Sequence, residues 1–121
     1  MSTADLKHLS VKEVDGVAVV DFVKSPLLFA SDVVEDIGKE LNSLLTDRGY
    51  QKILLDFTHV QYVSSTMLAQ ITKLEREVEQ AKGKLKLCGL GPVLKDTLRI
   101  SHLERMFAIY DDADAALKSA W

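Results

Sequence analysis

The segment ILLDFTHVQYVSSTMLAQITKLEREVEQ, residues 53–80, joins a short apolar run to a long helical pattern through a polar turn. The unbroken apolar run at residues 53–55 is typical of a strand that is covered on both faces, as in a parallel sheet. Apolar residues then recur at steps of four and three, which predicts an amphipathic helix that ends near Gly83. The residues of this stripe are Met67, Ile71, Leu74, Val78 and Ala81.

Upstream of this segment, the dipeptide Asp15-Gly16 predicts a tight turn. We therefore expect a hairpin of residues 7–14 and 17–23. The other predicted elements are a helix from Ser31 or Asp32 to Arg48, a strand at 84–88, a helix at 93–100, a strand at 106–110 and a helix capped by Asp111 or Asp112. Two antiparallel strands followed by alternating helices and strands favour an α/β fold, as a single layered domain over residues 1–121 with a mostly parallel sheet.

The charge and hydrophobicity of the chain exclude two classes of partner. The 121 residues include 15 Lys+Arg against 18 Asp+Glu, a net charge of -3, which gives no basic surface for nucleic acid. The longest apolar stretches are far shorter than the roughly 20 residues that cross a bilayer, and residues 1–10 lack the apolar core of a signal peptide. We therefore expect a cytoplasmic protein with no membrane partner.

The motifs of cofactor and metal chemistry are missing from the sequence. Neither of the glycine-rich phosphate-binding motifs, G-x-x-x-x-G-K-[ST] and G-x-G-x-x-G, occurs. The histidines His8, His59 and His102 lack metal-ligand spacing. Cys88 is the only cysteine, so no internal disulfide forms, and its place in an alternating strand pattern predicts a buried apolar role. We expect no cofactor and no metal.

Three consecutive hydroxyl side chains, Ser64, Ser65 and Thr66, lie where the long helix is predicted to begin. Serine and threonine are preferred as helix N-caps, so one of them has a structural use. A serine hydrolase is the catalytic alternative, since Asp56 and His59 lie nearby in the sequence. The G-x-S-x-G elbow that exposes a nucleophilic serine is absent, so we predict that the protein is not an enzyme.

The residues ILLDFTHVQYVSSTMLAQI resemble the STAS family, the domain shared by sulfate transporters and bacterial anti-sigma factor antagonists. In that family a strand ends in Asp, and a motif of the type Asp-Ser-[Ser/Thr]-Gly-Leu opens a helix, with the Ser as phosphate acceptor. The similarity continues through GKLKLCGLGPVLKDTLRISHLERMFAIYDDADAAL and covers roughly residues 14–117.

Carried over residue by residue, the resemblance implies that Ser65 is the phosphate acceptor, with Ser64 and Thr66 as alternatives. Leu68 takes the place of the motif leucine. This sequence departs from the motif twice, since Ser64 replaces the usual Asp and Met67 the usual Gly. The residues that we expect at the partner-binding surface are Asp56, His59, Tyr62, Ser64, Thr66 and Met67.

The resemblance implies a partner-switching module with no catalysis of its own. An anti-sigma factor with serine kinase activity would bind the unphosphorylated form, and phosphorylation by that partner would end the binding. A phosphatase and other STAS domains are further candidate partners. Two other functions stay open: a scaffold or subunit of a multi-STAS assembly that is not phosphorylated, in which a serine is only a helix cap, and a small serine hydrolase.

Overall fold

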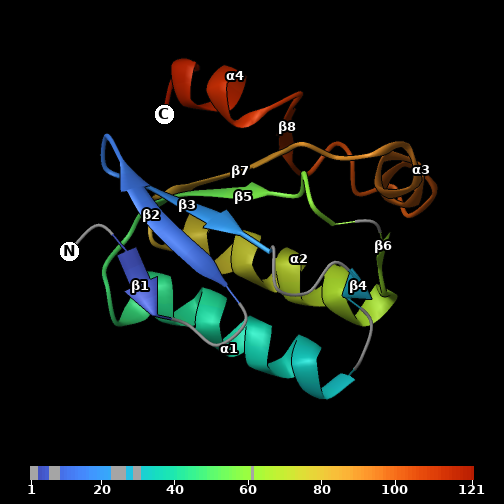
Figure 1. The fold of residues 1–121 in the computed structure, drawn as a ribbon, viewed down its shortest axis with the longest axis horizontal. Helices are drawn as coiled ribbons and strands as arrows, with labels where there is room; N and C mark the ends of the chain where they lie inside the picture. Colours follow the sequence, from blue (N-terminus) through green and yellow to red (C-terminus); the bar gives the residue numbers. More distant parts are fainter. Residues whose placement is uncertain (1–2, 6–8, 23–26, 29–30, 61) are drawn as a thin grey trace.

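The computed structural model of the protein describes residues 3–5, 9–22, 27–28, 31–60 and 62–121. Its main sheet has the strand order β1-β2-β3-β5-β7-β8 (Figure 1). These strands are β1 (Thr3–Asp5), β2 (Ser10–Val14), β3 (Val17–Asp21), β5 (Lys52–Asp56), β7 (Lys84–Cys88) and β8 (Ala108–Tyr110). β1, β2 and β3 pair in antiparallel fashion, whereas β3, β5, β7 and β8 run parallel. The predicted α/β fold with a mostly parallel sheet is confirmed.

The predicted hairpin is formed by β2 and β3. Its turn residues Asp15 and Gly16 both have positive φ, 52° and 82°, which suits the right-handed twist of the strands. The predicted outer ends of the hairpin, at residues 7 and 23, lie outside the described residues. β1, which pairs with β2, lies before the predicted hairpin and was not predicted from the sequence.

The two faces of the sheet are covered by different elements. The inner face, which includes Ala18 and Leu55, packs in the main core with the apolar stripes of α1 (Ser31–Thr46) and α2 (Ser65–Gln80). The outer face carries a smaller cluster with α4 (Ala113–Lys118), seen above the sheet in Figure 1. We call this the outer-face cluster, and its buried residues are Val17, Val19, Leu54, Cys88 and Ala116.

The remaining elements gather at one end of the molecule. β4 (Leu27–Leu28) and β6 (Tyr62–Val63) form a separate parallel pair, and α3 (Pro92–Ile100) lies against β6 (Figure 1). β6 leads directly into α2, so this end of the molecule also holds the hydroxyl residues singled out in the sequence. No described helix combines the length and hydrophobicity needed to span a membrane.

Most helix boundaries follow the sequence signals, with corrections at the two ends of α1. α1 begins at Ser31, so the candidate caps Ser31 and Asp32 are its first two helical residues and neither precedes the helix. α1 ends at Thr46, two residues before the predicted Arg48. Gly49 has φ 71°, as expected for the residue that closes a helix, and the Asp47, Arg48 and Tyr50 amides bond back to the last turn. For α4, the cap is Asp112, whose Oδ1 accepts from the Ala115 amide at 2.8 Å.

Two C-terminal elements differ slightly in extent from their predictions. The third helix starts one residue earlier than expected, at Pro92, because the fixed φ of proline suits the first helical position. The last strand covers only Ala108–Tyr110 of the predicted residues 106–110. Neither shift changes the order of elements.

Candidate functional site

Asp56 ends β5 and fixes the turn that follows. Its Oδ1 accepts from the Thr58 amide at 2.9 Å and from the Thr58 hydroxyl at 2.5 Å. A Cβ added at Gly89 would lie 2.9 Å from the same Asp56 oxygen, so the loop after β7 packs directly on this turn. The half-buried Asp56 therefore fixes the turn after β5 and lies against the loop after β7, and its role in partner binding stays a prediction.

Ser64 is the N-cap of α2. Its backbone is extended, with φ -79° and ψ 165°, and its Oγ accepts from the Met67 amide at 3.1 Å. Its carbonyl accepts the first helical bond, from the Leu68 amide, at 3.0 Å. Because the cap bond satisfies an amide that has no partner within the helix, the half-buried Ser64 hydroxyl has a structural function.

Ser65 and Thr66 occupy the first two positions of α2, and both are exposed. Neither hydroxyl makes a hydrogen bond to another residue within the described ranges. The helix therefore begins without any contribution from these two side chains. Of the three consecutive hydroxyls, one caps the helix and two are accessible to another molecule.

Met67, the third residue of α2, points into the protein and not toward solvent. Its side chain is 0% exposed and packs in the main core with Leu68 and Ile71. The prediction that Met67 contacts a partner is therefore wrong, because a fully buried side chain cannot reach a protein surface. Its position in the apolar stripe of the helix was the better guide.

Exposed side chains from other elements lie at the same end of the molecule as the start of α2. His59 is exposed in the turn after β5, and Tyr62 is 45% exposed in β6. Val93, at the second position of the neighbouring α3, is 56% exposed. Sequence reasoning missed Val93, since only the contact between α3 and β6 brings it to this end of the molecule.

The arrangement does not favour nucleophilic catalysis. Asp56 bonds to Thr58, and no bond links His59 to a serine among the residues that the structure describes. Burial raises the pKa of the Cys88 thiol to about 12, and the charge of Asp56 and a hydrogen bond to Asp56 act in the same direction. The thiol therefore stays protonated and unreactive. Over the described ranges, no three His, Cys, Asp or Glu side chains gather as metal ligands.

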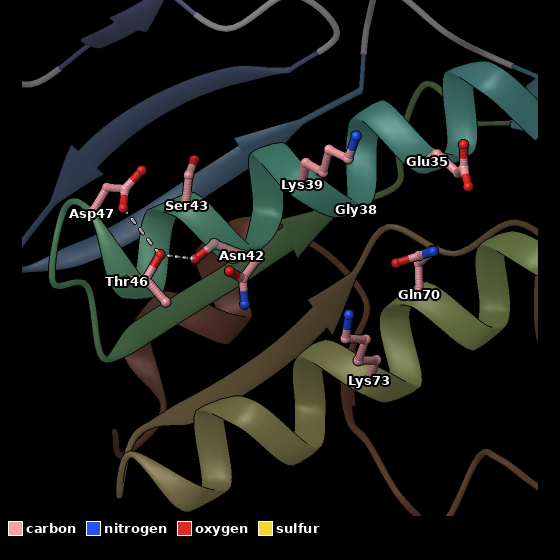
Figure 2. A pocket seen from close by; sticks show the side chains of 9 residues that line it. All are labelled: Glu35, Gly38, Lys39, Asn42, Ser43, Thr46, Asp47, Gln70 and Lys73. Carbon is pink, nitrogen blue, oxygen red and sulfur yellow. Dashed lines mark hydrogen bonds between the residues drawn. The ribbon is translucent and has the colours of Figure 1, made fainter.

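A separate polar groove of about 450 Å³ runs between α1 and α2 (Figure 2). Figure 2 shows Lys39 on α1 and Lys73 with Gln70 on α2 along its walls. None of the site residues predicted from the sequence lines this groove. The positive and negative side chains along the groove are equal in number, so it has no net charge that would favour a particular ligand, and we assign it none.

The STAS domain family model matches residues 8–116 of this chain. BtrV of Bordetella bronchiseptica, named as a proposed anti-sigma factor antagonist, is 29% identical over 70 residues, which cover 58% of this chain and 60% of BtrV. The chain thus spans less than two thirds of that relative.

Solved structures share the fold. The structure of TM1081 from Thermotoga maritima, named as a proposed anti-sigma factor antagonist, superposes with a TM-score of 0.80 at 23% identity, covering 91% of this chain and 92% of that one. The phosphorylated form of the Bacillus cell fate determinant SpoIIAA has a TM-score of 0.70 at 16% identity, covering 91% and 97%. At these identities the likeness establishes the fold alone, whereas the family match covers most of the sequence. The chain belongs to the STAS domain family.

Proposed function

We propose that this STAS domain is a phosphorylation-controlled binding module of the anti-sigma factor antagonist type. In its unmodified form it binds an anti-sigma factor with serine kinase activity, and transfer of phosphate to Ser65 ends that binding. The observation that carries the proposal is that the hydroxyl side chains at the start of α2 have different roles. Ser64 is occupied as the cap, whereas the Ser65 hydroxyl is exposed and has no hydrogen-bond partner among the described residues.

A phosphate on Ser65 is compatible with the fold. It would lie at the positive end of a 16-residue helix whose first turn contains no acidic residue. A negative charge in such an exposed position contributes roughly 0.3 to 1 kcal/mol of stability. Phosphorylation therefore alters the surface and leaves the core unchanged.

The same charge disfavours a protein interface. Tyr62 and Val93 supply exposed apolar area at this end of the molecule, and His59 and Thr66 supply polar contacts. A partner that covers this surface would have to strip water from a phosphate with nearly two negative charges. Since Ser64 is neutral where the family motif has Asp, the unmodified surface carries one charge fewer and the contrast on phosphorylation is larger.

Release of a bound kinase tests this proposal. The protein is mixed with a candidate anti-sigma factor that has serine kinase activity, and the complex is followed by size-exclusion chromatography before and after addition of ATP and magnesium. We expect the wild-type complex to dissociate and the Ser65→Ala complex to persist. Dissociation of both complexes alike would contradict the proposal.

The oligomeric state separates this function from a scaffold. A module of the proposed kind forms a small complex with one kinase, whereas a subunit of a multi-STAS assembly associates with sister domains. An unphosphorylated protein that forms large assemblies under the same conditions would favour the scaffold. In the proposed cycle, a phosphatase regenerates the binding form in the cytoplasm, and the protein itself catalyses no reaction.

A further inference from the structure

Lys86, in the middle of β7, is a buried cation on the outer face of the sheet. Its side chain is 4% exposed. Within the part of the chain that the structure describes, no carboxylate lies within ion-pair distance of its ammonium. A buried ammonium needs other polar partners, because its desolvation is otherwise unfavourable.

Those partners all come from the C-terminal part of the chain. The Nζ atom donates to the Ser119 hydroxyl at 2.7 Å and to the Ala120 carbonyl. It also lies 4.3 Å from the centroid of the Trp121 ring and 5.2 Å from that of Tyr110, within the range of cation–π attraction. One lysine thus binds three consecutive residues that follow α4.

Residues 113–121, which we call the strap, are bonded within themselves. The Ser119 hydroxyl donates to the Ala116 carbonyl at 2.5 Å, and the Trp121 indole donates to the same carbonyl at 3.0 Å. These bonds fasten the residues after α4 to the helix, so that the helix and its C-terminal extension form one unit. Ala116 places this unit on the outer-face cluster.

The contacts between the strap and the sheet centre on two residues. The first is Lys86, and the second is Tyr110 in β8, which forms a hydrogen bond with the Ser119 side chain. This hydrogen bond is the largest of the influences that lower the pKa of Tyr110. Burial opposes the shift, and the nearby Lys86 charge adds to it. Apart from these polar contacts, the strap is held by apolar packing of side chains such as Leu117.

We propose that the strap is a releasable cover of the outer face, which opens as a unit and is held closed by Lys86. Opening is feasible because it returns the Lys86 ammonium to water, and the regained hydration offsets part of the free energy that is lost with the contacts. A helix of six residues is also too short to be stable when detached, so opening and local unfolding coincide. The inner face with α1 and α2 keeps its packing throughout.

The sequence provides one reporter on each side of this contact. Cys88, the only cysteine, is buried in the outer-face cluster with Ala116, whereas Trp121, the only tryptophan, belongs to the strap. Native-state labelling of Cys88 with a thiol reagent therefore measures opening. Acrylamide quenching of Trp121 fluorescence measures the same event from the strap itself.

The test compares Lys86→Met with Lys84→Met. Methionine keeps the buried stem of Lys86 and removes its charge, and Lys84 is an exposed lysine of the same strand, which makes it the matched control. We expect Lys86→Met to label at Cys88 about tenfold faster than wild type, with stronger Trp121 quenching. Lys84→Met should behave like wild type.

Two outcomes would overturn the proposal. One is equal labelling of wild type, Lys86→Met and Lys84→Met. The other is an equal acceleration of amide exchange in β3 and β5, which would mean that Lys86 supports the whole fold and not a separate unit. If Lys86→Met does not fold, Trp121→Leu provides a second comparison by Cys88 labelling, because it keeps Lys86 and removes one aromatic partner of the ammonium together with the indole bond to Ala116.

Discussion

Two helices, α2 and α3, begin at the same end of the molecule with the same burial pattern but different chemistry. In both, the first two residues are exposed and the third is buried, Met67 in α2 and Leu94 in α3. The carbonyl of each cap residue accepts the first helical bond at 3.0 Å. The cap of α2 is Ser64 with a side-chain bond, whereas that of α3 is Gly91 without one.

The difference shows which hydroxyls the fold requires. α3 begins with Pro92-Val93 and needs no hydroxyl in its first turn. In α2, the single cap bond from Ser64 completes the same structural task. Ser65 and Thr66 therefore have no structural function in common with α3, and this difference supports the proposal that Ser65 accepts a phosphate.

The largest effect is expected at the buried third position. Met67→Ala should lower the free energy of unfolding by about 3 kcal/mol, because it removes a fully buried side chain and leaves a cavity. Urea denaturation measures this change, with the exposed Val93→Ala as control. A loss below about 1 kcal/mol would mean that the core accommodates the change and that the burial pattern overstates the importance of this position.

The next effect concerns binding. Ser65→Asp should weaken the complex with the partner kinase by about a hundredfold, since an interface would have to desolvate the added carboxylate. The thermal midpoint should stay close to that of wild type. Ser65→Asn, of similar size but neutral, is the control in isothermal titration calorimetry, and equal affinities of the two variants would show that charge is not what controls binding.

A smaller effect separates the two serines. Ser64→Ala should cost about 1 kcal/mol of stability through loss of the cap bond, whereas Ser65→Ala should change stability by less than about 0.5 kcal/mol. Chemical denaturation of both variants gives the two values. Equal losses would contradict the assignment of Ser64 as the sole cap.

The smallest effect is a gain at α3. Gly91 has φ -76° and ψ 173°, which any residue adopts, and an added Cβ would meet no atom within 4 Å. Gly91→Ser should therefore supply the missing side-chain cap and raise the free energy of unfolding by a few tenths of a kcal/mol. A loss of stability in the same denaturation assay would indicate that the two helix starts are not equivalent.

Much of this fold could be read from the sequence because the deciding signals are local. Asp15-Gly16 specifies its turn, and the apolar run at 53–55 specifies a strand buried on both faces. The apolar stripe also placed Met67 in the core correctly, although the family motif suggested a surface role. Packing outweighed the motif at this position.

The features that escaped prediction depend on residues far apart in the chain. Lys86 lies in an alternating pattern with Lys84, and nothing local indicates that the strap covers one lysine and leaves the other exposed. Val93 comes to the end of the molecule where α2 begins only through the packing of α3 on β6. Such contacts follow from topology, which single-sequence periodicity does not specify.

The most direct measurement is a map of the phosphate after incubation with the partner kinase, ATP and magnesium, made by fragmentation mass spectrometry of the peptide that contains residues 64–66. The exposed position of Ser65 and the capping bond of Ser64 predict a single phosphate on Ser65. Phosphate on Ser64, or no phosphate on any of the three hydroxyls, would contradict the proposed role of Ser65 as the phosphate acceptor.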